Sequence, residues 1–305
     1  MESPRLPRFK RAPAVSPIEL TDRDCLILRL VHRHRFLRSS HLIALVGGSA
    51  QPLLRRLQLL YHHGFLERPR AQLEYFHEGG SRPMVYGLGT KGGKLLRREL
   101  GLPSRPISWG EKNRAVGRMF LEHALLVSDV LVALELSCRR SGCVRLLLDE
   151  DLPIPGKSQP GFKWKVKLNG HVHLGVVPDR VFGLEVTRED GGSERAYFFL
   201  EADRGTMPVT RRNLSQTSFA RKLLAYEATW SQGIHRSLFG FHRFRVLTVT
   251  ASAARVESLV EACSQLKRGH GLFLFADRTV LEHPDILFSP IWQSGRAGEL
   301  SSLLP

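Results

Sequence analysis

Two short apolar runs, each ending in acidic residues, constrain the fold of this chain more than any other feature. Val172–Val176 leads to Val177-Pro178-Asp179, and residues 197–200 lead to Glu201-Ala202-Asp203. Short apolar runs bounded by glycine and charged residues are typical of buried β-strands. The sequence therefore predicts a sheet in which two strands end in carboxylates.

The spacing of these acidic residues indicates a metal site. Side chains two residues apart on a strand point the same way, so Glu201 and Asp203 share a face. If the strand before Asp179 lies alongside, three carboxylates converge, and such hard oxygen ligands suit Mg²⁺ or Mn²⁺. The opposite interpretation has equal weight, because strand-end carboxylates also form structural ion pairs, here with Arg180 and Arg204.

Charge points to a polyanionic partner. The chain has 305 residues, enough for two domains or one large one, and 42% of them are hydrophobic. Its net charge is +16. Residues 1–110 hold 19 Lys and Arg against 8 Asp and Glu, an excess of +11, while residues 111–305 hold 26 against 21, an excess of +5. A basic domain of this kind most often binds nucleic acid.

Cysteine usage and hydropathy bear on the compartment. The four cysteines are scattered without the paired spacing of a zinc site or a disulfide framework. The basic, proline-rich residues 1–17 lack the apolar core of a signal peptide, and no run of 18 apolar residues occurs. We expect a cytoplasmic protein with no membrane partner, and a flexible tail over residues 1–17.

The pattern over residues 18–102 predicts a small helical domain. A helix is expected from Thr21, which forms a capping box with Asp24, to about residue 34, and residues 35–38 are expected to break it. A second helix begins at Ser39 or Ser40 and ends at Gly47-Gly48. A third is capped by Ser49, and a hairpin (residues 65–67 and 84–88) and a closing helix (residues 90–100) follow.

The outer face of the third helix carries residues able to read DNA. Gln51, Arg55, Gln58 and His62 repeat at i, i+4, i+7 and i+11 and so share one side of the helix. Gln and Arg side chains can reach base edges.

This order of three helices, a two-stranded wing and a closing helix resembles the winged helix-turn-helix domain. The most specific segment is Val85-Tyr86-Gly87-Leu88-Gly89-Thr90-Lys91-Gly92-Gly93-Lys94-Leu95-Leu96, similar to the passage from wing to last helix. The resemblance implies that the third helix enters the major groove of double-stranded DNA and that the wing contacts its backbone or minor groove. The alternative is a basic face that is solvated or binds protein. The predicted DNA-contacting residues are Gln51, Arg55, Arg56, Gln58 and His62 on the helix and Arg68, Arg70 and Arg82 on the wing.

A linker over residues 103–112 and a second domain over residues 113–305 are expected next. The domain begins with a long helix (residues 113–139). Strands at 144–148, 172–177 and 196–200, a helix at 218–230, a strand at 244–250, a helix at 253–266 and a strand at 271–275 follow. The fold class is therefore α/β (α+β), with a mixed sheet flanked by helices.

The second domain resembles the restriction-endonuclease-like superfamily, the PD-(D/E)xK nucleases. Val177-Pro178-Asp179 matches the Pro-Asp element, Glu201-Ala202-Asp203 falls at the (D/E)xK element, and residues 223–226, Leu-x-x-Tyr, are similar to an element of exonuclease-related members. The resemblance implies that Asp179, Glu201 and Asp203 hold the metal and that a lysine orients or deprotonates the nucleophile.

Asp203 occupies the position of the motif lysine, which leaves several alternatives open. Lys222 or Arg204 takes the role of the lysine, the site binds metal without cleaving, or the domain is a degenerate scaffold. The resemblance also implies a further acidic residue on the long helix, Glu122 or Asp129.

A rival metal site lies just upstream. His171-Val172-His173 would place two imidazoles on one face of a strand, as in nucleases that form a covalent bond between a tyrosine and a 5′-phosphate. Tyr197 or Tyr226 would then be the nucleophile, although paired histidines on a strand are more often packing or surface residues.

The whole layout, over residues 18–290, resembles the replication-relaxation proteins of plasmids and other mobile elements. The segments that carry this resemblance are residues 85–96, 123–129, 178–179, 201–203 and 222–226. It implies a DNA-binding protein of mobile-element replication or transfer, with a metal-dependent DNA endonuclease or nickase site of PD-(D/E)xK type. The alternative is a non-catalytic replication accessory factor or transcriptional regulator, whose second domain forms a homodimer or recruits replication or mobilisation proteins.

Overall fold

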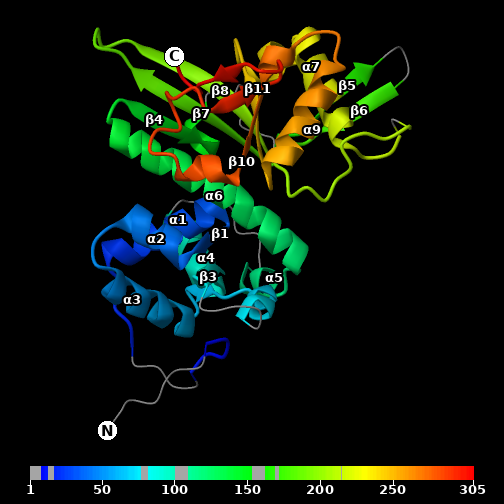
Figure 1. Cartoon of the computed structure of the whole chain (residues 1–305). Coiled ribbons are helices and arrows are strands. Elements are labelled where there is room, and N and C mark those ends of the chain that lie inside the picture. The colour runs from blue at the N-terminus through cyan, green and yellow to red at the C-terminus, as the bar shows by residue number, and fades with distance from the viewer. Residues whose placement is uncertain are drawn as a thin grey trace. The chain divides into compact units, whose positions relative to one another are not determined.

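The computed structural model of the chain describes residues 8–12, 17–76, 82–99, 109–152, 162–168, 172–213 and 215–305. The chain divides into two compact units, Met1–Val132 and Ala133–Pro305. Helix α6 (Arg118–Ser141) runs across the boundary between them (Figure 1). None of the helices in the described ranges combines the length and the apolar character that a membrane crossing needs.

The first unit contains the three predicted helices, α1 (Asp22–His34), α2 (Ser39–Val46) and α3 (Ala50–His62). Helix α1 begins at the predicted capping box, in which the Thr21 side chain accepts from the backbone of Asp24 and the Asp24 carboxylate accepts from the backbone of Thr21. These bonds satisfy backbone N–H groups that the first turn leaves without helical partners.

A three-stranded antiparallel sheet completes the core of this unit, with the strand order β1-β3-β2. Strands β2 (Leu66–Glu67) and β3 (Val85–Leu88) are the predicted hairpin pair, and the 3₁₀ helix η1 (Arg70–Phe76) follows β2. Residues 77–81, between the two predicted hairpin strands, lie outside the described residues. Strand β1 (Phe36–Arg38) occupies the segment expected to be a break, because three residues are too few to show an alternating pattern.

The glycine-rich passage from β3 to helix α4 (Thr90–Glu99) packs directly against the end of α3 and the start of β2. A Cβ atom at Gly89 would lie 2.4 Å from the carbonyl oxygen of Gly64, and one at Gly92 would lie 2.3 Å from that of Phe65. Real Cβ atoms do not approach so closely, so this passage requires glycine at both positions.

The short helix α5 (Trp109–Arg114) precedes α6. Residues 115–117 are not helical, so the long helix predicted from residue 113 is interrupted and forms two helices. Of the predicted linker over residues 103–112, the part up to residue 108 lies outside the described residues, and residues 109–112 belong to α5.

The second unit is built on a seven-stranded mixed sheet, which confirms the predicted α/β class. Strands β7, β8, β9 and β10 form its centre; β8, β9 and β10 are parallel, and the other neighbouring strands are antiparallel. In spatial order the strands are β12 (Leu300–Ser301), β11 (Trp292–Ser294), β10 (Phe273–Asp277), β9 (Arg245–Thr250), β8 (Ser193–Ala202), β7 (Arg180–Thr187) and β4 (Val144–Leu148).

The strand beside Glu201 is not the one that the sequence predicts. Val172–Val176, strand β6, pairs with β5 (Trp164–Leu168) in a separate two-stranded sheet. The neighbour of β8 is β7, which starts immediately after Asp179. The expectation missed β7 because a glycine and a glutamate interrupt its apolar residues.

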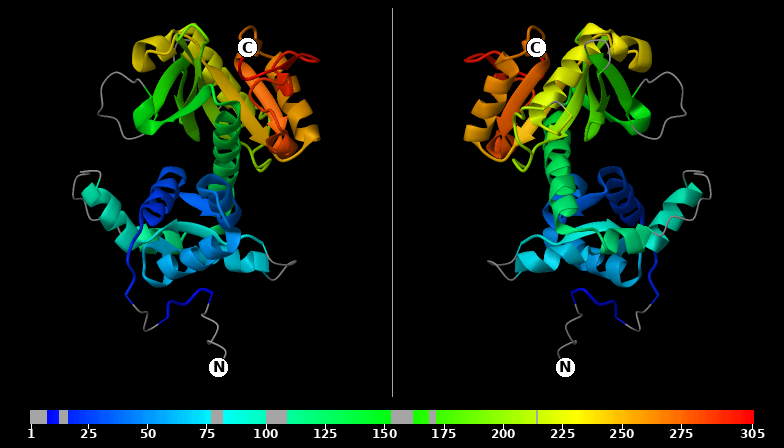
Figure 2. Two further views of the ribbon diagram at one scale, coloured as in Figure 1. Left: turned by 90° about the vertical axis from the view of Figure 1, so that its left-hand side faces the viewer. Right: turned by 90° about the vertical axis from the view of Figure 1, so that its right-hand side faces the viewer.

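Helices α7 (Phe219–Ser231), α8 (Ile234–Phe239) and α9 (Ala253–Ser264) share one hydrophobic cluster with the sheet and with β5 and β6. Figures 1 and 2 show α7 and α9 against the sheet. Ser218 and Ser252 cap α7 and α9 by accepting from the backbone N–H groups of Arg221 and Arg255, and the cap at Ser252 confirms the predicted start of α9.

Candidate functional site

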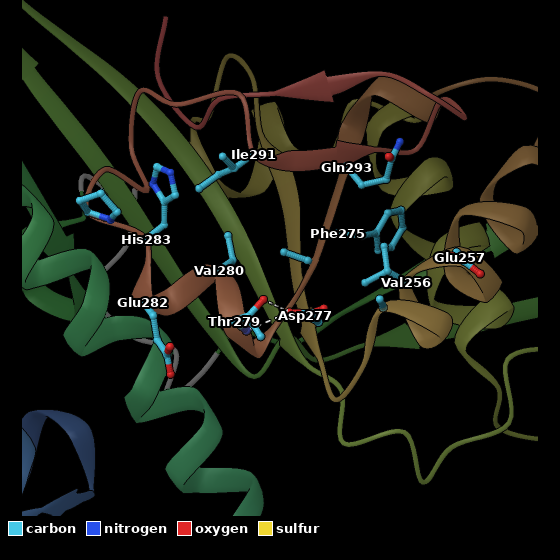
Figure 3. Close-up of a pocket in the computed structure, with 13 residues that line it drawn as sticks. Val256, Glu257, Phe275, Asp277, Thr279, Val280, Glu282, His283, Ile291 and Gln293 are labelled. Carbon is cyan, nitrogen blue, oxygen red and sulfur yellow. Dashed lines mark hydrogen bonds between the residues drawn. The ribbon is translucent and has the colours of Figure 1, made fainter.

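A pocket of about 680 Å³ opens beside α9, at the end of β10 (Figure 3). Phe275, Val280 and Ile291 contribute to its apolar walls, and Glu257 and Glu282 are acidic residues in its lining. The residues that line it include none of those predicted to bind metal or perform chemistry. The candidate site must therefore be built from the ends of β7 and β8.

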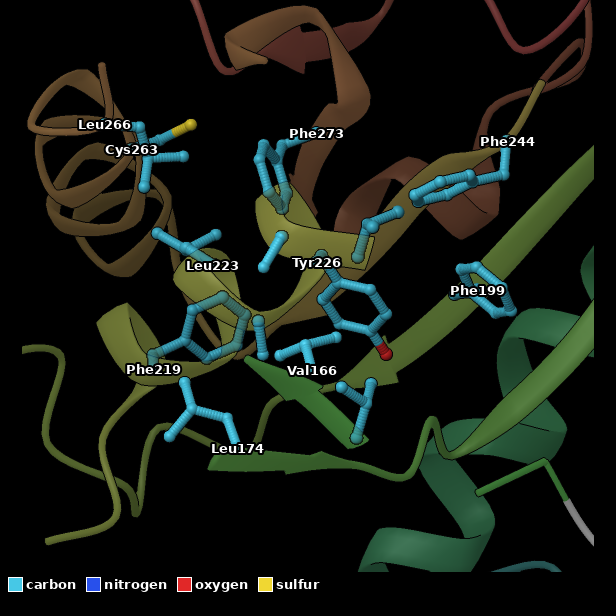
Figure 4. Close-up of a cluster of buried hydrophobic side chains, with 14 of the residues drawn as sticks. Val166, Leu174, Phe199, Phe219, Leu223, Tyr226, Phe244, Cys263, Leu266 and Phe273 are labelled. Atoms are coloured by element: carbon cyan, nitrogen blue, oxygen red, sulfur yellow. The ribbon is translucent and has the colours of Figure 1, made fainter. Parts of the chain in front are cut away.

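Glu201 is the penultimate residue of β8, and it is 2% exposed. Its Oε2 atom lies 2.5 Å from Nζ of Lys222, and its Oε1 atom accepts a hydrogen bond of 2.5 Å from the hydroxyl of Tyr226. Lys222 and Tyr226 are four residues apart on α7, so one face of the helix presents both to the strand. Figure 4 shows the Tyr226 ring within the hydrophobic cluster, with its hydroxyl oxygen at the edge of the ring.

Asp179 lies beside Glu201 at the start of β7. Its backbone N–H donates to the carbonyl of Leu200 over 3.0 Å, and its Oδ2 atom accepts from the backbone N–H of Ala202 over 2.8 Å. These two bonds bracket Glu201 on the neighbouring strand. The Asp179 charge acts on the ionisation of Glu201, Lys222 and Tyr226, which makes the four residues one electrostatic group.

The pKa shifts of this group follow from burial and from its opposing charges. Burial raises the pKa of Glu201, and Asp179 adds to the rise, while the Lys222 ammonium opposes it. Burial disfavours the charge on Lys222, but Glu201 and Asp179 outweigh it and raise the pKa of the amine. Burial, and after it the Glu201 charge, raises the pKa of Tyr226 well above its ordinary value. At neutral pH the site therefore holds a charged Lys222 and a protonated Tyr226.

Asp203 has different partners. It lies just past the end of β8, and its carboxylate accepts from Nε of Arg255 at 2.8 Å and from the hydroxyl of Thr250 at 2.8 Å. Within the described ranges no group of three or more His, Cys, Asp or Glu side chains is arranged to hold a metal ion. The three carboxylates expected to converge are thus not gathered into one such group. The sequence carries no signal for Arg255, which comes from a helix 52 residues away.

The two acidic residues considered on the long helix are bonded within the first unit. Glu122 accepts from Arg118 over 2.9 Å, and Asp129 pairs with Arg38 and with His41, the latter at 3.0 Å. Both carboxylates thus have basic partners in the first unit.

The residues that the structure describes do not assemble the alternative site of two histidines and a tyrosine nucleophile. His171 lies outside the described residues, and His173 is exposed on β6. Of the two candidate nucleophiles, Tyr197 stacks on Phe241 with ring centroids 4.0 Å apart, and Tyr226 is 1% exposed.

The predicted DNA-contacting residues divide into two groups. Five of them are accessible to a ligand: four are exposed, Gln51, Arg55, Arg70 and Arg82, and Gln58 is half-buried. Arg56, His62 and Arg68 instead make contacts within the fold, described next.

Arg56 donates from Nε to Oδ1 of the buried Asp24 over 2.8 Å. Arg68 is 6% exposed and donates to the hydroxyl of Tyr86 over 3.1 Å. His62 was expected on the outer face of α3 but is 4% exposed.

The segment over residues 8–12 explains the burial of His62. The backbone N–H of Ala12 donates to Nδ1 of His62 over 2.9 Å, and Arg11 donates to the carbonyl of Tyr61 and to the carboxylate of Glu67. This part of the predicted flexible tail is therefore held against the last turn of α3. Burial lowers the pKa of His62, so the ring stays neutral at pH 7.

Comparison with known proteins identifies one family. The family model described as replication-relaxation matches residues 28–242, which is more than two-thirds of the chain. No curated protein and no solved structure matches the chain. The matched range includes Asp179, Glu201, Lys222 and Tyr226 and all of α3.

Proposed function

The chain belongs to the replication-relaxation family, and on that premise we propose that it binds double-stranded DNA in the replication or transfer of a plasmid or other mobile element. We propose further that its second unit is a PD-(D/E)xK-type site that nicks this DNA with Mg²⁺ or Mn²⁺. Asp179, Glu201 and Lys222 carry the chemistry in this proposal.

The contact between Lys222 and Glu201 supports the nuclease half of the proposal most strongly. The motif lysine is missing because Asp203 stands in its place, yet an amine from α7 lies 2.5 Å from the Glu201 carboxylate. Lys222, on the helix that follows the strand, thus contacts the carboxylate that a motif lysine two residues along the strand would contact. Lys222 rather than Arg204 is therefore the residue to which we assign the role of the lysine.

The donor set fits a small hard cation. Mg²⁺ is usually bound through one or two carboxylates, with waters and substrate phosphates completing its coordination. Asp179 and Glu201 would be its protein ligands, since each carboxylate oxygen that accepts one hydrogen bond keeps a second lone pair. A bound cation would supply a Lewis acid for a phosphate oxygen and a water of lowered pKa.

The residues of the chain itself have separate tasks in this proposal. Lys222 remains charged because its pKa is raised, so its ammonium can balance the negative charge that builds on a phosphate under attack. Tyr226 keeps the Glu201 carboxylate in one orientation through its hydrogen bond. Asp203, held by Arg255, fixes the end of β8, and its charge helps to raise the pKa of Lys222.

The first unit supplies DNA recognition in this proposal. The three helices, the hairpin and α4 form an arrangement of winged-helix type, in which α3 would lie in the major groove. Gln51 and Arg55 on the exposed face of α3 would contact bases or phosphates, and the exposed Arg70 and Arg82 near the wing would contact the backbone.

A second candidate function is non-catalytic. Both oxygens of Glu201 accept hydrogen bonds from the chain's own side chains, and the described residues hold no three-residue metal group. These observations favour a replication accessory factor or regulator whose second unit is a scaffold for a homodimer or for replication or mobilisation proteins.

Nicking of a supercoiled plasmid separates the two functions. The wild type is incubated with Mg²⁺ or Mn²⁺ and compared with Asp179→Asn and with Glu185→Gln, a control that removes a carboxylate of β7 paired on the surface with Arg145 and Arg195. We expect the wild type and the control to nick and Asp179→Asn to be inactive. Intact duplex binding by a wild type that does not nick would favour the non-catalytic function, and a wild type that does not bind DNA would refute both.

A further inference from the structure

The segment between the two halves of the site is strongly basic. Residues 204–226 contain five basic residues, Arg204, Arg211, Arg212, Arg221 and Lys222, and no acidic one. The segment starts just after Glu201 and Asp203 and ends in α7, so it is joined at both ends to the candidate site. We name residues 204–217 the arginine loop; it is the yellow-green coil that precedes α7 in Figure 1.

The base of the arginine loop is fixed. Arg255, which pairs with Asp203, also donates to the carbonyl of Met207 over 2.6 Å. On the returning side, the backbone N–H groups of Phe219 and Ala220 donate to the carbonyls of Pro208 and Val209 over 3.0 and 2.8 Å. The loop therefore leaves and rejoins the fold at defined points.

The far part of the loop presents its charge to solvent. Arg211 and Arg212 are both exposed, and in the part of the chain that the structure describes neither has a carboxylate partner. Arg211 donates to the side-chain oxygen of Gln216 over 3.3 Å, and Arg221 donates to the carbonyl of Ser215 over 3.0 Å. These bonds shape the loop without neutralising it. Several other arginines of the unit are paired with carboxylates, as Arg145 is with Glu185.

We propose that the arginine loop is a second DNA contact of this protein, which binds the phosphate backbone of the duplex next to the Glu201–Lys222 site. This proposal rests on the proposed function, since it takes duplex DNA as the partner. Exposed guanidinium groups form paired hydrogen bonds with phosphate oxygens, and phosphate contacts fix the position of DNA without reading its sequence. Because the base of the loop is anchored through Asp203, the loop would hold the DNA backbone at a set position relative to Glu201.

The salt dependence of DNA binding tests the proposal. Affinity of the full chain for a short labelled duplex is measured between about 50 and 200 mM salt, and each phosphate contact contributes about 0.9 to the slope of log K against log [salt]. For Arg211→Ala/Arg212→Ala we expect the slope to fall by about 1.8, twice the value for one contact.

A matched control removes the same charge elsewhere on the unit. Arg236 on α8 and Arg243 before β9 are also exposed arginines, so Arg236→Ala/Arg243→Ala lowers the net charge equally. We expect this control to keep the wild-type slope and Arg211→Lys/Arg212→Lys to restore most of it. An equal fall in both alanine pairs, or an unchanged slope in the loop pair, would overturn the loop contact.

The same titration separates this inference from the function on which it rests. If Arg55→Ala weakens binding while the loop pair leaves it unchanged, the loop contact fails and DNA binding by the first unit stands. If the wild type binds no duplex at all, both fail together.

Discussion

The ammonium group of Lys222 lies 2.5 Å from Oε2 of Glu201, although one residue is on a helix and the other is on a strand 21 residues earlier. The Glu201 side chain is 2% exposed and that of Lys222 is one-third exposed, so the pair joins the interior to the surface. Only the solvent-facing part of such a pair is open to a ligand. A phosphate would therefore approach from the Lys222 side.

Lys222→Met should abolish nicking and leave duplex binding at the wild-type level. The change also removes the cation beside a buried carboxylate, so we expect the free energy of unfolding to fall by about 1 to 3 kcal/mol. Plasmid nicking, duplex affinity and denaturant unfolding are measured on the same preparation. Nicking at the wild-type rate would remove Lys222 from the proposed chemistry.

Asp179→Asn should weaken Mn²⁺ binding at least about tenfold, which corresponds to about 1.4 kcal/mol. The amide keeps an oxygen that can accept from Ala202, so the fold should be retained while the ligand charge is lost. Calorimetric titration with Mn²⁺ measures the affinity, with Glu185→Gln as the control. Equal affinity in the wild type and in Asp179→Asn would refute this residue as a ligand.

The elements that the sequence predicts well are those with local signals. The capping box at Thr21 and Asp24 locates the start of α1, and the cap at Ser252 locates the start of α9, because both signals depend on neighbouring residues. Strands β4 and β9 are likewise bounded within a residue of the expected ends, since each is a short segment made mainly of apolar and threonine residues.

The partners of the predicted site residues depend on contacts that the sequence does not encode locally. Asp203 faces Arg255 and Thr250 because β8, β9 and α9 meet there, and His62 is buried because residues around Ala12 lie over it. Periodicity predicts only the face of a strand or helix on which a residue lies. It cannot reveal which distant segment covers that face.

Arg55 and Arg56 are adjacent on α3 but should fail in different assays. Arg55 is exposed, so Arg55→Ala should lower duplex affinity and reduce the salt slope by about 0.9 with little change in melting temperature. Arg56 donates to the buried Asp24, so Arg56→Ala should destabilise the unit by about 1 to 3 kcal/mol. Anisotropy and thermal unfolding measure the two effects. The reverse assignment would show that the exposed face of α3 does not contact DNA.

Neither the wild type nor Tyr226→Phe should become covalently attached to DNA. The hydroxyl is buried, it donates to Glu201, and its pKa is raised well above the ordinary value, all of which disfavour a phenolate nucleophile. Nicked DNA is separated on a denaturing gel with and without protease treatment. A protease-sensitive DNA adduct that disappears in Tyr226→Phe would reinstate the covalent route.

Asp24→Asn should destabilise the first unit at neutral pH but not in acid. Burial alone would raise the pKa of Asp24, but hydrogen bonds from Arg56 and Thr21 outweigh it and lower the pKa below its usual 3.8. The ionised carboxylate therefore contributes stability that is fully present well above pH 3.8 and is lost as the pH falls through the lower, folded-state pKa. We expect a difference of about 1 to 3 kcal/mol between wild type and variant at pH 7, which closes below pH 3.8. Denaturant unfolding at a series of pH values measures it.

Asp22→Asn, an exposed change in the same helical turn, is the control and should cost less than about 1 kcal/mol. If the difference in the free energy of unfolding between wild type and Asp24→Asn were the same at every pH, Asp24 would act through its shape and not through its charge.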